Sequence, residues 1–312
     1  MRAMTMIPAM AIVLAASPLH AQSTSPQSAT LDGIAPQIEA GFTTFMAENH
    51  VPGLVYGVVQ GGQLALVKGE GVQDVTVRRP VTPDSLFRIA SMTKAFTALS
   101  ILSLRDKGLL SLDDPAEKYV PEMRGWTYPT SDSPKIRVRD LLQHVAGFVT
   151  DDPWGDRQQV LSQEDFTALL KTGVPFTREP QARHEYSNLG YAILGRIVAN
   201  VTGQPYRRYV EKTFLVPLGM ASSGYDTPAS PIERRAVGYR WENGAWSEEP
   251  TMKDGAFNSM GGLQVSANDY AKWIAFLLSG WPARDGPETG PVRRATIREL
   301  AQGLNFVSVA TR

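Results

Sequence analysis

The segment RIASMTKAF, residues 89–97, places Ser91 and Lys94 three residues apart at the start of an apolar run. On a helix this spacing returns both side chains to one face, within reach of each other. Such a pair can perform acyl transfer, with serine as the nucleophile and lysine as its base. The lysine pKa must then fall from ~10.4 toward neutrality, which requires burial and a polar partner. The ordinary alternative is a serine that caps a helix and a lysine whose charged end stays in water.

Tyr186 and Asn188 form a second candidate pair, in the segment YSNLGYAILG, and no other Tyr-x-Asn occurs in the chain. Taken alone, this segment is typical of a loop that leads into a helix, with Tyr186 in the core. Its significance depends on whether the fold brings it close to Ser91 and Lys94.

Other kinds of catalytic centre fit the sequence poorly. The Gly-x-Ser-x-Gly elbow of α/β-hydrolases is absent. There is no cysteine, and the histidines beyond residue 21, which are His50, His144 and His184, lack metal-ligand spacing. His144 is the one candidate for a serine–histidine pair, but a buried structural histidine is the better interpretation. We therefore expect neither a metal nor an organic cofactor.

Together, the Ser-x-x-Lys and Tyr-x-Asn motifs resemble those of the serine β-lactamase and penicillin-binding family. The resemblance runs from about residue 31 to residue 303, through the blocks LFRIASMTKAFTALSILSL, VRDLLQHVAGF, YSNLGYAILGRIVANVTGQPYRRYVEKTFLVPLGM and MGGLQVSANDYAKWIAFLLSG. It is closest to the class C β-lactamase-like branch, which also contains esterases and D-aminopeptidases or carboxypeptidases.

This resemblance implies a role for each of the four residues. Ser91 would be the nucleophile and Lys94 its base partner. Tyr186 would be a second proton shuttle, and Asn188 a hydrogen-bond partner of the substrate amide. The implied fold is α/β (α+β), β-lactamase/transpeptidase-like, with an antiparallel sheet flanked by helices and an all-helical lobe.

Two features depart from the family pattern. Gln181 follows Pro180, where the family usually has glycine, and we expect a modest change of that loop. The family's third motif, KTG or HxG, lies on a strand beyond the SANDYAKW helix, and the sequence ends at Arg312 without it. That strand supplies one oxyanion-hole donor, and loss of such a donor typically costs roughly 10²–10³ in rate. We therefore expect the C-terminal strands to be missing, with LNFVSVA at 304–310 as one short strand.

Periodicity predicts the elements that precede and carry the serine motif. Apolar residues at helical spacing predict a helix over 31–49. The β-rich runs LVYGVVQ and QLALVKG flank Gly61 and Gly62, which predicts a tight hairpin. A helix that begins at Ser91 is expected to end at Gly108.

The later part of the chain is expected to be mostly helical. Helices and proline-rich loops predict a helical lobe over about 109–254. Ser266 and Asp269 form a capping-box pattern before an amphipathic helix over 270–279.

The first 21 residues, MRAMTMIPAMAIVLAASPLHA, have the layout of a secretory signal peptide. Their apolar run is too short to span a bilayer, and no later segment of the sequence is a candidate for a membrane span. We expect residues 22–312 to form the hydrolase domain, incomplete at its C-terminus, in a periplasmic or secreted protein.

The charge composition indicates which classes of binding partner the protein is suited to. Lys plus Arg and Asp plus Glu both number 31, so no net field draws the chain to nucleic acid or an anionic membrane. Small esters, amides or peptides fit better, and the oligomeric state is not indicated. The expected function is hydrolysis of small esters or amides through an acyl-serine. The alternatives are a β-lactamase or D-alanyl-D-alanine carboxypeptidase, and a truncated, inactive or merely acyl-binding member.

Overall fold

The computed structural model describes residues 27–150 and 158–303. The predicted signal peptide and the predicted strand over 304–310 lie outside the described residues. Contacts divide the chain into two units, residues 1–48 and 49–312, and each is considered by itself. In the first, helix α1 spans Gln27–Glu48, so it begins before the predicted residue 31.

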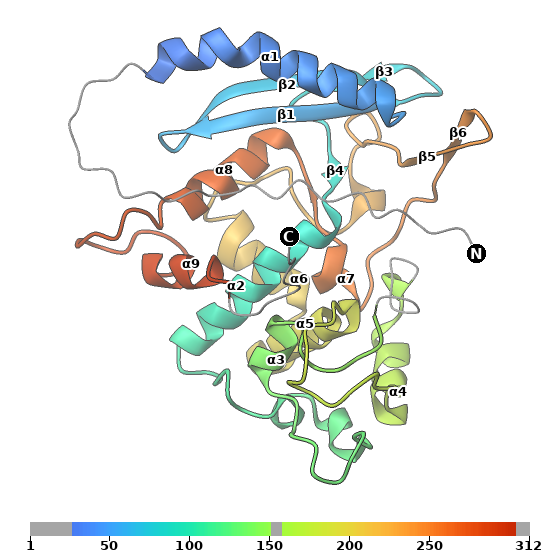
Figure 1. Ribbon diagram of the computed structural model, residues 1–312, viewed down its shortest axis with the longest axis vertical. Helices are drawn as coiled ribbons and strands as arrows, with labels where there is room; N and C mark the ends of the chain where they lie inside the picture. Colours follow the sequence, from blue (N-terminus) through green and yellow to red (C-terminus); the bar gives the residue numbers. More distant parts are fainter. Residues whose placement is uncertain (1–26, 151–157, 304–312) are drawn as a thin grey trace, which may run out of the picture. The chain divides into compact units, whose positions relative to one another are not determined.

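The second unit opens with the predicted hairpin. Strands β1 (Gly53–Gln60) and β2 (Gln63–Asp74) pair in antiparallel fashion, with a register shift between Val58 and Val59. Gly61 and Gly62 have φ of 59° and 80°, the left-handed conformation that a two-residue turn requires. The short strand β3 (Arg79–Pro80) extends the sheet in the order β1-β2-β3 (Figure 1).

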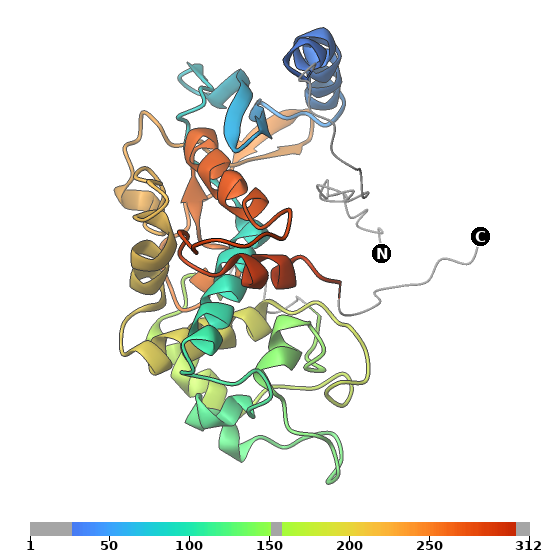
Figure 2. The same ribbon diagram turned by 90° about the vertical axis from the view of Figure 1, so that its left-hand side faces the viewer.

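Helix α8 lies between this sheet and helix α2 in both ribbon views (Figures 1 and 2). α8 spans Ala267–Leu278 and α2 spans Thr93–Asp106. Trp273 of α8 is fully buried and stacks on Phe96 of α2, with ring centroids 3.7 Å apart. The cap predicted at Ser266 is confirmed, because its side chain accepts the N–H of Asp269; the helix begins at residue 267 rather than 270.

In the described residues of 109–238, the regular elements are helices joined by long loops. Helices α3 to α6 span Val138–Leu142, Gln163–Thr172, Asn188–Thr202 and Tyr206–Val210. A π-helical turn follows at Glu211–Leu215, and 3₁₀ turns occur at Ala116–Lys118, Pro121–Gly125 and Thr227–Ala229.

The expectation of an all-helical lobe is wrong over residues 239–248. Strands β5 (Tyr239–Glu242) and β6 (Ala245–Glu248) form an antiparallel hairpin there. Asn243 and Gly244 make the turn with φ of 53° and 80°. An Asn-Gly pair is a strong hairpin signal because both residues tolerate positive φ, so the sequence contained evidence against an uninterrupted helical lobe.

The remaining elements of the described chain are two short strands and two helices. Strand β4 (Phe87–Arg88) pairs with β7 (Gln264–Val265), α7 spans Asn258–Gly261, and α9 spans Arg294–Leu300. Across residues 27–150 and 158–303, the helices are too short or too polar to be candidates for crossing a bilayer.

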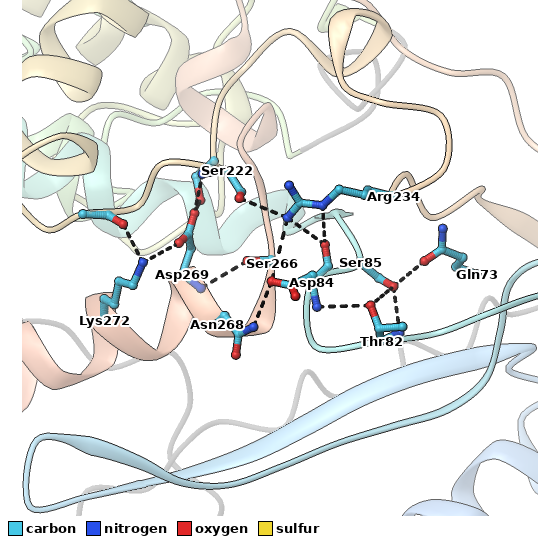
Figure 3. A network of polar contacts seen from close by, with 12 residues as sticks. Gln73, Thr82, Asp84, Ser85, Ser222, Arg234, Ser266, Asn268, Asp269 and Lys272 are labelled. Carbon is cyan, nitrogen blue, oxygen red and sulfur yellow. Dashed lines mark hydrogen bonds and ion pairs between the residues drawn. The ribbon is translucent and has the colours of Figure 1, made fainter.

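A polar network fixes the turn before β4 (Figure 3). Arg234 donates to the carbonyl oxygen of Asp84 at 3.0 Å and to the Ser222 hydroxyl at 3.0 Å. Asp269 accepts the Ser222 N–H at 2.8 Å and the Lys272 ammonium at 2.9 Å. The network therefore connects the turn at residue 84, the loop at residue 222 and the start of α8. The turn at residue 84 lies a few residues before Ser91 in the sequence.

Helices α5 and α7 pack closely at Gly195. Gly195 lies where a Cβ would come within 2.6 Å of the Ser259 Cβ. Ser259 is almost fully buried, and its hydroxyl donates to the Tyr191 carbonyl oxygen at 2.8 Å. The absence of a side chain at 195 therefore lets α7 approach α5.

We predict that Gly195→Ala lowers the free energy of unfolding by about 1–2 kcal/mol. Overpacking typically costs about 1–3 kcal/mol, which exceeds the gain of about 1 kcal/mol from the better helix propensity of alanine. Gly190→Ala, in the same helix, is the matched control, because its Cβ would meet atoms no nearer than 3.7 Å. Urea unfolding should show a neutral or stabilising effect at 190; a Gly195→Ala protein as stable as wild type would contradict the packing argument.

Candidate active site

Ser91 lies at an exposed turn that the β4–β7 pair holds in place. Ile89, just after β4, donates its N–H to the Leu263 carbonyl oxygen at 3.0 Å. Ala90 then adopts φ of 45°, and a 3₁₀ turn over Ala90–Met92 leads directly into α2. Positive φ is costly for a residue with a Cβ, so the surrounding contacts hold a strained backbone immediately before the serine.

Lys94 is buried behind Ser91, with 7% of its surface exposed. Its Nζ donates to the Asn188 Oδ1 and to the Met260 carbonyl oxygen, both at 2.7 Å, and lies 3.2 Å from the Ser91 Oγ. The rings of Tyr186 and Tyr191 have their centroids 4.9 Å and 5.4 Å from the same nitrogen. The solvated lysine considered from the sequence is therefore excluded.

Tyr186 and Asn188 are positioned by the start of α5. The Ser187 hydroxyl caps this helix by accepting the Gly190 N–H at 3.1 Å. Asn188, the first helical residue, is thereby turned inward toward Lys94 and is buried. The Tyr186 hydroxyl lies 2.6 Å from the Ser91 Oγ. The structure thus brings together all four residues that the sequence singled out.

Glu185 anchors the segment on its other side. Its carboxylate accepts hydrogen bonds from the Thr150 hydroxyl, the Thr177 hydroxyl and the Arg178 Nε, each at 2.8 Å. Charge-assisted bonds of this kind are stronger than neutral ones. The residue before Tyr186 is consequently fixed to the loop over 177–178.

The loop around Gln181 adopts a left-handed backbone at a residue that is not glycine. Gln181 adopts φ of 71° and donates its N–H to the Val145 carbonyl oxygen at 2.7 Å. Its side-chain amide donates to the buried Asp140 at 3.1 Å. A left-handed glutamine that hydrogen-bonds Asp140 therefore occupies the position after Pro180.

His144 is a neighbour of this site that the sequence interpretation assigned to structure alone. Its Nδ1 accepts the Ser187 N–H at 3.1 Å, and its ring centroid lies 4.6 Å from that of Tyr186. Burial, with smaller contributions from the nearby Lys94 and His184, lowers its pKa to about 3. No sequence signal linked His144 to Tyr186, because they are far apart in the chain and neither motif implies the other.

A cavity of about 280 Å³ adjoins His144, and none of the four motif residues lines it. His144, His184 and Tyr191 line it, and so do the charged residues Arg139 and Glu299. A cavity of about 560 Å³ elsewhere is lined partly by Arg196 and Arg207 and includes none of the four motif residues. In the part of the chain that the structure describes, no cluster of three or more His, Cys, Asp or Glu is arranged to hold a metal ion.

Chemically, the arrangement suits attack by an exposed hydroxyl. Ser91 Oγ faces two groups that can accept or relay its proton, the amine of Lys94 and the phenol of Tyr186. One of these, Lys94, is desolvated and therefore able to act as a base when it is neutral.

Known proteins resemble this chain in sequence and in structure. A family model described as Beta-lactamase matches residues 38–309. Protein flp of Staphylococcus aureus (strain N315) is 31% identical over 242 residues, which cover 75% of this chain and 47% of that protein. Beta-lactamase-like protein 2 of Dictyostelium discoideum is 36% identical over 211 residues, 65% of this chain and 38% of that protein. The chain therefore spans about half the length, or less, of these curated relatives.

Solved structures resemble the chain over a larger share of its length. The octameric penicillin-binding protein homologue from Pyrococcus abyssi has a TM-score of 0.71 and 29% identity, covering 85% of this chain and 59% of that one. A class C beta lactamase from Rhodobacter sphaeroides has a TM-score of 0.66 and 26% identity, covering 83% and 68%.

We predict that His144 makes folding sensitive to acid. Its folded pKa of about 3 lies below the ordinary 6.5, so between these values the unfolded chain binds the proton that the folded chain does not. The free energy of unfolding should therefore decrease as pH falls through this window, by up to about 1.4 kcal/mol per pH unit.

Urea unfolding of wild type and His144→Asn, whose new side chain does not titrate, isolates this contribution. The stability difference between the two proteins should shrink or reverse from about pH 6.5 to about pH 4.5. A difference that stays constant across that range would show that His144 does not carry the acid sensitivity.

Proposed function

The chain belongs to the Beta-lactamase family, and from this premise we propose that it is a serine hydrolase that cleaves small esters or amides through a covalent acyl-serine. The observation that carries the proposal is the contact between three groups: the Ser91 Oγ lies 2.6 Å from the Tyr186 hydroxyl and 3.2 Å from the Lys94 Nζ. An exposed nucleophile beside a buried amine is the arrangement that nucleophilic catalysis needs.

The contacts of Lys94 suit a neutral amine. Such an amine has two N–H bonds and one lone pair. The two shorter contacts, both 2.7 Å, run to oxygens of Asn188 and Met260 that can only accept. In this form, the lone pair can accept the hydroxyl proton of Ser91, whose Oγ lies 3.2 Å from the Lys94 Nζ.

The proposed reaction has two balanced steps. The Ser91 Oγ bonds to the carbonyl carbon while its proton passes to Lys94, directly or through Tyr186. Collapse of the tetrahedral adduct breaks the bond to the leaving alcohol or amine, which takes that proton. Water then attacks the acyl carbon, gives its proton to the same base, and releases the acid as Ser91 regains its hydrogen.

Two parts of the substrate need hydrogen-bond donors: the carbonyl oxygen, on which negative charge develops, and the amide group. We assign the first task to the backbone N–H of Ser91, at the turn that leads into α2, because such N–H groups and the helix dipole favour negative charge. We assign contact with the substrate to the side-chain amide of Asn188, whose oxygen is held by Lys94. This bond fixes the orientation of the amide, leaving its NH₂ group as the donor.

A second candidate function is hydrolysis of β-lactams or of D-alanyl peptides. It is favoured by the resemblance to the penicillin-binding protein homologue and the class C beta lactamase. We retain the ester or small-amide preference because the block HVAG, residues 144–147, resembles the esterase-containing branch. We also propose that the protein is periplasmic or secreted, on the basis of the signal-peptide pattern in residues 1–21.

We predict that a fluorophosphonate labels Ser91 and that Ser91→Ala abolishes both labelling and hydrolysis of p-nitrophenyl butyrate. Tyr186→Phe should lower kcat by about 10²–10⁴, the usual contribution of a positioned proton-transfer group. Ser100→Ala is the matched control, because Ser100 lies in the same helix and its hydroxyl donates only locally, to the Phe96 carbonyl oxygen at 2.8 Å.

Peptide mapping by mass spectrometry decides the first part of this prediction. An adduct on a residue other than Ser91 would overturn the assignment of the nucleophile. Labelling of Ser91 without turnover would instead favour an acyl-binding protein over an enzyme.

We further predict that kcat/KM is higher for p-nitrophenyl butyrate than for nitrocefin or a D-alanyl-D-alanine peptide. The three rates should be measured side by side on wild type and Ser91→Ala, so that only serine-dependent turnover counts. Nitrocefin turnover far above ester turnover would make the β-lactamase function the better one.

A further inference from the structure

His144 contacts the segment around Tyr186 at three points. Its carbonyl oxygen accepts the Glu185 N–H at 2.7 Å, and its Nδ1 accepts the Ser187 N–H at 3.1 Å. Between these two bonds, its ring lies against the Tyr186 ring, with centroids 4.6 Å apart and planes inclined by 33°. One residue thus holds both chain neighbours of Tyr186 and the face of its ring.

The hydrogen bond from Ser187 requires a particular form of His144. Nδ1 can accept only when it carries no proton, which places the proton of the neutral ring on Nε2. Burial, the largest cause, lowers the pKa of His144 to about 3. The acceptor is therefore present throughout the neutral pH range.

The backbone of His144 is also strained. Its φ of 56° is a left-handed conformation, which costs roughly 1 kcal/mol or more for a residue with a Cβ. Glycine or asparagine would adopt it with less strain. Histidine is itself enriched among left-handed residues that carry a Cβ, so a role for His144 must rest on its side-chain contacts.

We propose that His144 is a positioning residue, which holds the Tyr186 hydroxyl within hydrogen-bond reach of the Ser91 Oγ. The inference rests on the proposed function, because it assigns His144 a part in the same proton transfer. Proton relay depends steeply on geometry, and a displacement of about 1 Å can cost about 10²-fold in rate. The Tyr186 hydroxyl lies at the end of a long side chain, so a small shift of residues 185–187 would displace it.

The competing explanation is that His144 only fills the core. In that case, substitutions would lower stability, but the folded fraction would react at the wild-type rate. The two explanations differ in kcat measured on folded protein, and in whether an acceptor at the Nδ1 position restores it.

The test compares His144→Phe with His144→Asn. Phenylalanine keeps an aromatic ring beside Tyr186 but has no acceptor for the Ser187 N–H. Asparagine loses the ring, but its Oδ1 occupies nearly the position of Nδ1 and it tolerates positive φ. With p-nitrophenyl butyrate, we expect His144→Phe to lose about 10²-fold in kcat with little change in KM, and His144→Asn to recover most of that loss.

Two further variants keep the test decisive. If His144→Phe does not fold cooperatively, His144→Gln replaces it, because its amide oxygen lies one bond too far out to match Nδ1; its kcat should be well below that of His144→Asn. His184→Phe is the control, since His184 lines the same cavity and contacts His144 only edge-on, with centroids 5.6 Å apart. Its kcat should equal that of wild type.

Crystal structures of wild type and the variants give a readout that does not depend on activity. We expect the 2.6 Å distance between the Ser91 Oγ and the Tyr186 hydroxyl to persist in wild type and His144→Asn and to exceed about 3.5 Å in His144→Phe. A wild-type kcat and an unchanged distance in folded His144→Phe would overturn the positioning role. A wild type with the short distance but no serine-dependent turnover would instead refute the proposed function.

Discussion

The burial of Lys94 is the constraint on which the rest of the site depends. A lysine nitrogen removed from water is costly unless nearby oxygens replace its hydration. Those oxygens come from three separate segments: Ser91 at the start of α2, Asn188 at the start of α5, and the Met260 carbonyl in α7. The fold must therefore hold three helix segments within hydrogen-bond distance of one atom, and a shift of any of them would leave a buried polar group unpaired.

The surrounding architecture can be understood from that requirement. Gly195 lets α7 approach α5, and the β4–β7 pair fixes the turn from which α2 starts. The network of Arg234 and Asp269 anchors the chain just before that turn (Figure 3). These features lie away from the reacting atoms, yet each sets the place of one partner of Lys94.

Backbone strain is found next to the same atoms. Ala90, His144 and Gln181 all adopt positive φ, and they lie before the serine, beside Tyr186 and in the loop that leads to it. Non-glycine residues keep such conformations only where their surroundings enforce them, and they cluster at functional sites. The strain is consistent with a site in which the placement of Ser91 and Tyr186 matters more than local backbone energy.

Much of this could be predicted from sequence, for identifiable reasons. The β-lactamase/transpeptidase-like fold is confirmed by the family match and the structural neighbours. The β1–β2 hairpin was predicted because two glycines interrupt β-rich runs, and the motifs identified Ser91, Lys94, Tyr186 and Asn188 because their spacing is distinctive. Their catalytic roles remain proposals.

Other features could not be predicted, or were missed. The Met260 carbonyl is a backbone group that no side-chain pattern reveals, and His144 meets Tyr186 only through long-range packing. The β5–β6 hairpin was overlooked although its Asn-Gly turn was visible in the sequence.

The central claim is that Ser91 forms a covalent acyl intermediate. The most direct measurement is acid-quenched mass spectrometry of the wild-type chain during turnover of p-nitrophenyl butyrate. The account predicts that the peptide containing Ser91 gains the mass of one butyryl group, and that the modified fraction decays as substrate is exhausted. Steady hydrolysis with an unmodified Ser91 peptide, or with the butyryl group on another residue, would contradict it.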